Sequence, residues 1–325
     1  MTMNSGVVLV VSGMSIGIAL SPFALDQSGN AVDTAVDLGR AAAAAGLSSV
    51  WLGQTFSHDA LLVAALIGRE VPGIEVGTSV IPVPGRHPLL VASQAQTAQA
   101  ATGGRFTLGL GLGARELSER AFGGPFDRPA ALLREFLTPL RAILDTGAAD
   151  FHGELLTAAN PMPATVAGAT PTVPVLVAAM GPRALAVTGE LADGTLPFLV
   201  GPEALAEHIV APLTAAAARA GRPRPRVVAF VPGVVTSEVT AARAAAEANT
   251  AFYDTIPSYR RVVELSGARR AAELVVYGDE ETVAARVADY FAAGATEVVF
   301  TQTDLTTPED QRRTWRLLGE LNRSR

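Results

Sequence analysis

The chain alternates between short apolar runs and longer alanine-rich segments in which apolar residues recur at helical spacing. Runs rich in Val, Ile, Leu and Phe are typical of buried strands, and the alanine-rich segments are long enough to be helices. A strand that is followed each time by a helix indicates a parallel sheet, because parallel strands need a crossover connection. The pattern predicts strands over residues 15–20, 48–53, 74–83, 105–113, 174–179, 193–200, 226–235 and 296–302.

Helices are predicted between these strands, and several of them carry end signals such as Gly46 after the first long helix. One insertion interrupts the alternation after the fourth strand, where residues 150–158 are expected to form a strand or hairpin outside the repeat. The predicted helices cover residues 31–46, 58–71, 130–146 and 281–294, together with a long alanine-rich helical region after residue 235 and a terminal helix from residue 308.

Eight strand–helix units close into a barrel more readily than they form an open doubly wound sheet. The competing dinucleotide-binding sheet lacks its fingerprint, because residues 109–115 (GLGLGAR) miss the third glycine at the required spacing. The fold class predicted is therefore α/β, a (β/α)8 TIM barrel with insertion segments. Residues 14–325 are expected to form this single barrel domain, and residues 1–13 an N-terminal extension that is disordered.

The composition narrows the class of function. A net charge of −6 and a pI near 5.3 argue against a general nucleic-acid binder. The extension has no charged n-region, and no apolar stretch reaches the roughly 20 residues that span a membrane, so a cytoplasmic protein without a membrane partner is expected. The chain contains no cysteine and no lysine, since all 25 basic residues are arginine, which excludes thiolate and Schiff-base chemistry.

A metal site is not expected, because the histidines lie in separate segments without acidic residues at ligand spacing. They are His58, His87, His152 and His208. The sequence also offers no strong protein nucleophile. We therefore expect a cofactor to perform the chemistry while the protein binds and orients the reactants.

Candidate site residues are those that follow the predicted strands, because ligands of such barrels bind at the carboxyl ends of the strands. Gln54, Thr55 and His58 follow the second strand. The three alternating glycines of residues 109–113 indicate either the close approach of a planar ligand or simple crowding at the barrel axis, and crowding is favoured on the motif alone.

Residues 178–183 (AAMGPR) are the most informative of these segments. Gly181 is suited to be an N-cap and Pro182 to be the first residue of a helix, so the free N–H groups that follow would attract an anion such as a phosphate. The alternative is that the segment only starts a helix and that Arg183 pairs with Glu190 or Asp193.

Residues 48–113 and 174–200 resemble the luciferase-like flavin monooxygenase superfamily, and more closely its branch that uses the deazaflavin coenzyme F420. The resemblance extends from about residue 14 to near residue 322 and implies a (β/α)8 barrel, usually a homodimer, that binds its tricyclic cofactor in the barrel mouth. It implies that Thr78, Ser79 and Val80 support the tricycle, with a cis peptide bond between Ser79 and Val80. By the same resemblance, Gly111, Leu112 and Gly113 line the ribityl chain, and Ala178, Ala179, Met180, Gly181, Pro182 and Arg183 bind the phosphate.

The sequence departs from that family at the predicted catalytic positions. Many relatives carry an Asp-His pair where this chain has Gln54 and Thr55. Hydride transfer then needs no side-chain acid, or the acid lies elsewhere, with His58 as the first choice, or the protein binds its cofactor without efficient turnover.

The resulting prediction is an F420-dependent oxidoreductase that transfers a hydride between C5 of the deazaflavin and an organic small molecule. The alternatives are an FMN-dependent two-component monooxygenase, which would need a partner reductase, and a non-catalytic flavin- or deazaflavin-binding protein.

Overall fold

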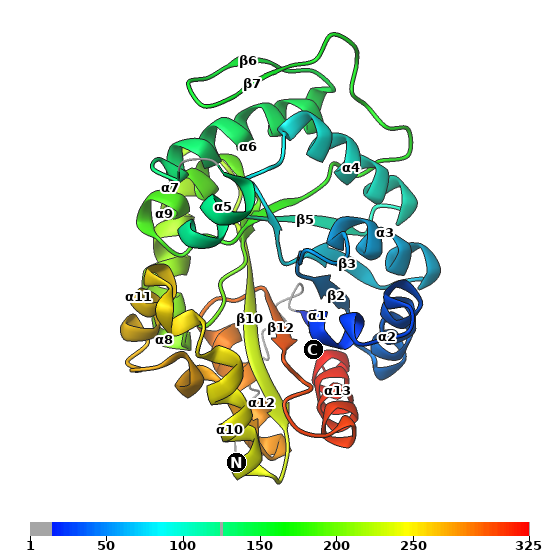
Figure 1. Cartoon of the computed structure of the whole chain (residues 1–325), viewed down its shortest axis with the longest axis vertical. Coiled ribbons are helices and arrows are strands. Elements are labelled where there is room, and N and C mark those ends of the chain that lie inside the picture. The colour runs from blue at the N-terminus through cyan, green and yellow to red at the C-terminus, as the bar shows by residue number, and fades with distance from the viewer. Residues whose placement is uncertain (1–14, 124–125, 325) are drawn as a thin grey trace, which may run out of the picture.

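The computed structural model describes residues 15–123 and 126–324 (Figure 1). Eight parallel strands form a closed barrel, since each pairs with the next and the last pairs again with the first. The predicted (β/α)8 fold is confirmed, whereas the predicted extension over residues 1–13 lies outside the described residues. In barrel order the strands are β1 (Ser15–Leu20), β2 (Ser49–Leu52), β3 (Glu75–Thr78), β5 (Phe106–Gly111), β8 (Val175–Val177), β9 (Gly194–Thr195), β10 (Arg226–Val235) and β12 (Glu297–Thr301).

Helices surround the barrel, and several begin or end at the signals that the sequence carries. The Asn30 side chain caps α2 (Ala31–Ala45), and Gly46 ends that helix in the left-handed region with φ 92°. The remaining helices are α1 (Pro22–Asp26), α3 (Ala60–Glu70), α4 (Pro88–Ala101), α5 (Arg115–Phe122), α6 (Pro129–Thr146), α7 (Pro182–Leu191), α8 (Pro202–Ala204), η1 (Leu205–Val210), α9 (Ala211–Arg219), α10 (Val239–Thr250), η2 (Tyr253–Thr255), α11 (Pro257–Leu265), η3 (Ala271–Leu274), α12 (Glu280–Ala292) and α13 (Pro308–Arg323). None of these helices combines the length and the apolar character that crossing a membrane would require.

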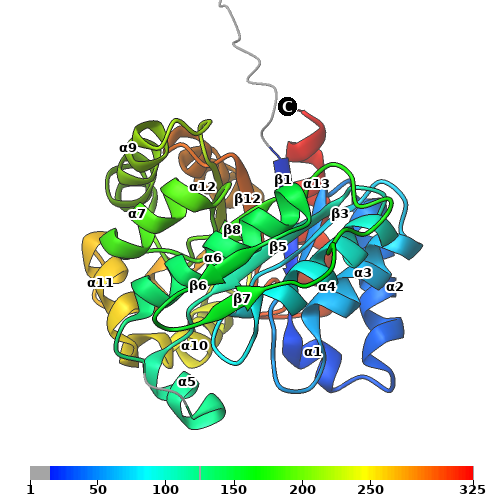
Figure 2. The ribbon, with the colours of Figure 1, turned by 90° about the horizontal axis from the view of Figure 1, so that it is seen from above.

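The predicted insertion contains an antiparallel hairpin of β6 (Asp150–His152) and β7 (Thr157–Ala159), which lies against the outside of α6 (Figures 1 and 2). The carboxylate of Glu135 on α6 accepts hydrogen bonds from the backbone N–H groups of Glu154, Leu155 and Leu156 at 3.1, 2.7 and 3.1 Å. One side chain therefore holds the turn of the hairpin on the barrel.

Two parts of the prediction are incomplete. The run 74–83 is divided into β3 and β4 (Ile81–Pro82), because the backbone bulges at Ser79 and Val80 between them. The helical region after residue 235 also contains a strand, β11 (Val276–Gly278), which pairs with the carboxyl end of β10. Three residues are too short a run to stand out against their helical surroundings.

The barrel interior is filled by side chains and is not a channel. Trp51, Leu176, Leu196, Val228, Phe230 and Val299 form one buried cluster inside it. A β-carbon on Gly77 would lie 2.4 Å from the Trp51 ring, so only glycine fits beside that indole. A ligand must therefore bind at the rim, and Figure 2 shows α1, α5 and α10 at the end of the barrel opposite the C-terminus, where the strands end.

Candidate active site

Three predicted cofactor-binding segments lie side by side at the carboxyl rim. A β-carbon built on Gly111 would lie 2.4 Å from Cγ2 of Val80 and 4.0 Å from Cβ of Ala178. The Ala178 N–H donates to the Leu110 carbonyl at 2.8 Å, which ties the third segment to the second. The peptide bond between Ser79 and Val80 is cis, as the resemblance implies.

The alternating glycines of β5 are required by the neighbouring strand. A β-carbon on Gly109 would lie 1.8 Å from the Thr78 carbonyl oxygen. The Thr78 hydroxyl fills the same gap, donating to the Gly109 carbonyl at 2.9 Å and accepting from the Gly109 N–H at 2.8 Å. Crowding against Thr78 at the end of β3 therefore explains why residue 109 is glycine. Gly113 has a different reason to be glycine, because its backbone is left-handed with φ 72° before α5.

The N-terminus of α7 is arranged as the sequence predicts. Gly181 is the N-cap with extended backbone, no side chain caps the helix, and Pro182 occupies its first turn. Among the described residues only the Leu185 N–H of the first turn has a partner, the Gly181 carbonyl at 2.9 Å. The N–H groups of Arg183 and Ala184 are therefore free to bind an anion.

Arg183 is exposed and forms no ion pair with any described residue. Its expected alternative partners are already engaged, because Glu190 pairs with Arg134 and Asp193 pairs with Arg141 and Arg222. The interpretation of Arg183 as a mere ion-pair partner of those two carboxylates is therefore wrong.

Not every side chain of these segments faces a ligand. Leu112 and Met180 pack against the main hydrophobic core between strands and helices, and Ala179 is buried with it. Their contribution to a ligand site would be through the backbone.

Gln54 is held by four hydrogen bonds of its side-chain amide. Its Nε2 donates to the carbonyls of Thr55 and His58 at 2.6 and 2.7 Å, and its Oε1 accepts from the Ala60 N–H at 3.2 Å and from Arg86 Nη2 at 3.0 Å. The Gln54 backbone N–H donates to the Val80 carbonyl at 3.1 Å. The amide is thus saturated, and it fixes the loop between β2 and α3 against the bulge.

Thr55 and His58 belong to a second network that reaches α1. The Thr55 hydroxyl lies 2.8 Å from the Ser57 hydroxyl, which donates to Asp26 at 2.6 Å and lies 3.1 Å from Nδ1 of His58. His58 Nδ1 is 3.7 Å from the Asp26 carboxylate, while its Nε2 forms no hydrogen bond or ion pair with a described residue. Of the three predicted catalytic residues, His58 is therefore the one whose side chain has a nitrogen atom without a hydrogen-bond partner among the described residues.

An aromatic cluster at the rim was not predicted from the sequence. Phe198 follows β9, and its ring meets those of Tyr253 and Tyr259 edge-on, with centroid distances of 5.2 and 6.1 Å. Tyr253 belongs to η2 and Tyr259 to α11, more than 50 residues further along the chain. No local motif signals the contact, because it depends on barrel closure.

Gln302, directly after β12, is a second unpredicted feature. Its backbone is left-handed with φ 53°, and its Oε1 is buried without a hydrogen-bond partner among the described residues. Such a conformation in a residue other than glycine is uncommon. Again no sequence pattern indicates it.

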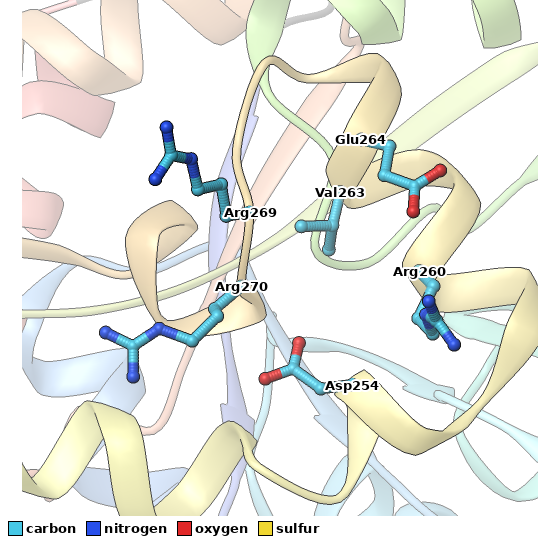
Figure 3. A pocket seen from close by; sticks show the side chains of 6 residues that line it. All are labelled: Asp254, Arg260, Val263, Glu264, Arg269 and Arg270. Carbon is cyan, nitrogen blue, oxygen red and sulfur yellow. The ribbon is translucent and has the colours of Figure 1, made fainter.

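Two cavities in the described part of the molecule are lined by residues outside the predicted cofactor segments. One, of about 330 Å3, is lined by residues of η2, α11 and the segment before η3 (Figure 3). The guanidinium groups of Arg269 and Arg270 extend away from Val263 and Glu264, so they do not converge on this space. The other, of about 400 Å3, lies at the start of α4 around His87. Within residues 15–123 and 126–324, no group of three acidic or histidine side chains could hold a metal ion.

The fold and the rim define a (β/α)8 barrel with an uncapped helix N-terminus beside a bulged strand. The chain belongs to the luciferase-like monooxygenase family, whose sequence pattern matches residues 14–297.

Two relatives are similar to this chain in sequence, and one solved structure is similar to it in fold. The chain is 33% identical over 254 residues to the uncharacterized protein Rv1360 of Mycobacterium tuberculosis, covering 74% of this chain and 73% of the relative. It is 28% identical over 208 residues to Rv3520c of the same species, provisionally named a coenzyme F420-dependent oxidoreductase, covering 59% of this chain and 57% of the relative. Its fold matches that of the oxygenating constituent of 3,6-diketocamphane monooxygenase from Pseudomonas putida, solved with FMN, with a TM-score of 0.74, 17% identity and coverage of 95% and 97%.

Proposed function

We propose that this chain is a coenzyme F420-dependent oxidoreductase that transfers a hydride between C5 of the deazaflavin and an organic small molecule bound at the carboxyl rim. The observation that carries the proposal is the N-terminus of α7, where uncapped N–H groups and an unpaired Arg183 follow the small residues Ala178 and Ala179. A phosphate-bearing cofactor supplies the anion that such a terminus binds. The name of the relative Rv3520c supports the choice of the deazaflavin.

The residues present fit such a cofactor at the rim. The backbone of Thr78, Ser79 and Val80 would support the ring system, and Gly111 with Gly113 would leave room beside it, because a side chain on Gly111 would meet Val80. Arg183 and the N–H groups of α7 would hold the phosphate. When bound, the coenzyme supplies the hydride chemistry, while the protein orients the substrate and excludes water from the reacting face.

Two alternatives follow from the same site. An FMN-dependent monooxygenase with a partner reductase is supported by the fold it shares with the FMN-bound 3,6-diketocamphane monooxygenase component. A cofactor-binding protein without turnover is supported by Gln54, whose saturated amide leaves no group at that position to move a proton. Oxygen consumption would favour the first alternative, and binding without reduction of any acceptor the second. We expect the protein to act as a homodimer in each case.

A titration with matched variants tests the phosphate site. Coenzyme F420 fluorescence is followed as purified wild-type protein, Arg183→Gln and Arg219→Gln are added. Arg219 is a suitable control because it is also exposed on a helix and forms no ion pair with a described residue. Loss of one charge-assisted contact should weaken binding about tenfold in Arg183→Gln only. Equal affinity in all three proteins would contradict the assignment.

A further inference from the structure

The Tyr253 and Tyr259 side chains form the core of the aromatic cluster at the rim. Their ring centroids are 4.8 Å apart with an interplanar angle of 68°, an edge-on contact of the kind that aromatic pairs prefer. Both rings also meet Phe198 edge-on. The three rings therefore hold one another in a defined arrangement.

Phe198 connects this cluster to the barrel interior. It packs against the buried interior cluster that contains Trp51 and Phe230, and its backbone forms an isolated parallel bridge to Phe230. Val80, which follows the cis peptide bond, packs against the same interior cluster. The interior cluster is thus in contact both with Phe198 of the aromatic cluster and with Val80 of the bulge that is proposed to support the cofactor.

The two hydroxyls of this cluster differ from those of the other tyrosines. The Tyr290 hydroxyl donates to the Val200 carbonyl at 2.9 Å, and the Tyr277 hydroxyl interacts with the Arg243 guanidinium. Neither Tyr253 nor Tyr259 has a hydrogen-bond partner for its hydroxyl among the described residues. Neither oxygen is among the buried polar atoms left without a partner, so neither is fully enclosed by the described residues. An available hydroxyl on a half-buried aromatic surface is suited to a ligand.

We propose that the phenolic hydroxyls of Tyr253 and Tyr259 bind the oxygen atom of a neutral carbonyl or alcohol substrate whose apolar body rests on Phe198. The inference rests on the proposed function, because a hydride added to the carbonyl carbon and a proton added to its oxygen together give the alcohol, and the reverse step removes both. A phenol donates a hydrogen bond to a carbonyl oxygen and accepts one from an alcohol, so the same group serves both. Burial raises the pKa of both tyrosines, which keeps the hydroxyls protonated at neutral pH.

The pair would add unpartnered polar groups to the rim besides Nε2 of His58. Gln54 is saturated, and Thr55 and His58 are joined to Asp26 through Ser57. In this proposal the two tyrosines orient the substrate, while the Gln54 amide fixes the loop after β2.

The full chain contains only four tyrosines, which allows a direct test. The protein is labelled with 13C at tyrosine Cζ, and the four signals are assigned from single Tyr→Phe variants. Cyclohexanone and cyclohexanol are then titrated as probes, with and without F420. We expect saturable shifts of the Tyr253 and Tyr259 signals and none at Tyr277 or Tyr290. Shifts at all four tyrosines, or at none, would overturn the proposal.

Variants add an affinity readout. Tyr253→Phe or Tyr259→Phe should raise the Kd for cyclohexanone about fivefold, as expected for one lost hydrogen bond, whereas the control Tyr277→Phe should leave it unchanged. An unchanged Kd in both rim variants contradicts the proposal. F420 binding without tyrosine shifts defeats this inference alone, and tyrosine shifts in a protein that fails to bind F420 defeat the proposed function alone.

Discussion

Nη2 of Arg226 lies 3.1 Å from Oε2 of Glu297, and this ion pair closes the amino-terminal end of the barrel beneath Trp51. Glu297 is only 1% exposed, and its other oxygen accepts from Trp51 Nε1 at 3.1 Å and from the Ser49 hydroxyl. Burial raises the pKa of the Glu297 carboxyl, and the opposing effects of Arg226 and these donors do not cancel the rise. The strand ends opposite the proposed active site thus hold a costly buried charge.

The first prediction concerns the pH dependence that Glu297 gives to stability. Its folded pKa lies above the ordinary 4.5, so the folded state binds more protons than the unfolded one. The stability that this carboxyl contributes is present below the ordinary pKa and is lost as pH rises through the folded value. Urea unfolding of wild type and Glu297→Gln is compared from about pH 4.5 to about pH 7.5, and the free energy of unfolding of the wild type minus that of the variant should fall as pH rises. A value that stays constant or rises with pH would contradict this prediction.

Asp310 should show the opposite slope. Burial alone would raise the pKa of its carboxyl, but hydrogen bonds from Thr306 at 2.8 Å and Thr236 at 3.0 Å outweigh burial and lower it below the ordinary 3.8. The stability it contributes is therefore complete above that value and lost as pH falls through the folded pKa. Asp310→Asn should cost about 2 kcal/mol at neutral pH, with the cost shrinking in acid. Thermal unfolding at several pH values measures both, and a cost independent of pH would argue against the charged hydrogen bonds.

The glycines of β5 provide a steric prediction. Gly109→Ala would place a methyl group 1.8 Å from the Thr78 carbonyl, which is backbone and has little room to move. We expect a loss of about 3 kcal/mol or failure to fold. Gly29→Ala is the control, because a β-carbon there meets nothing within 4 Å, and it should change stability by less than about 0.5 kcal/mol. Equal stability of the two variants in chemical denaturation would show that β5 and the bulge are not in close contact.

Much of the fold could be predicted because its signals are local. Apolar runs mark the strands, and Asn30, Gly46 and Pro182 mark helix ends within one turn of the chain. The helix start within the rim segment 178–183 could be predicted for the same reason, since an N-cap glycine followed by proline is a local signal.

The rest depends on contacts between distant parts of the chain. Nothing near Tyr259 in the sequence indicates that its ring will meet Phe198, because barrel closure brings them together. The role of Gln54 was equally hidden, since its amide is saturated by groups that include Arg86 from beyond the next strand. Position after a strand suggests a site residue without revealing whether its polar atoms are free.

Gln54 therefore carries a prediction of its own. Gln54→Ala removes four hydrogen bonds that fix the loop after β2, and it should lower the free energy of unfolding by about 2 kcal/mol. Thr55→Ala, in the same loop, should cost less than half as much, since among the described residues the Thr55 hydroxyl forms hydrogen bonds with Ser57 alone. Thermal unfolding of both variants checks this. An undiminished stability of Gln54→Ala combined with lost turnover would assign Gln54 to the chemistry instead.

A fluorescence titration of the purified wild-type chain with F420 and, separately, with FMN tests the proposed function directly. We expect the deazaflavin to bind in the micromolar range or tighter and FMN to bind more weakly. Preference for FMN would contradict the proposed function and direct attention to oxygen and a reductase. Binding of neither would show that the N-terminus of α7 does not hold a cofactor phosphate.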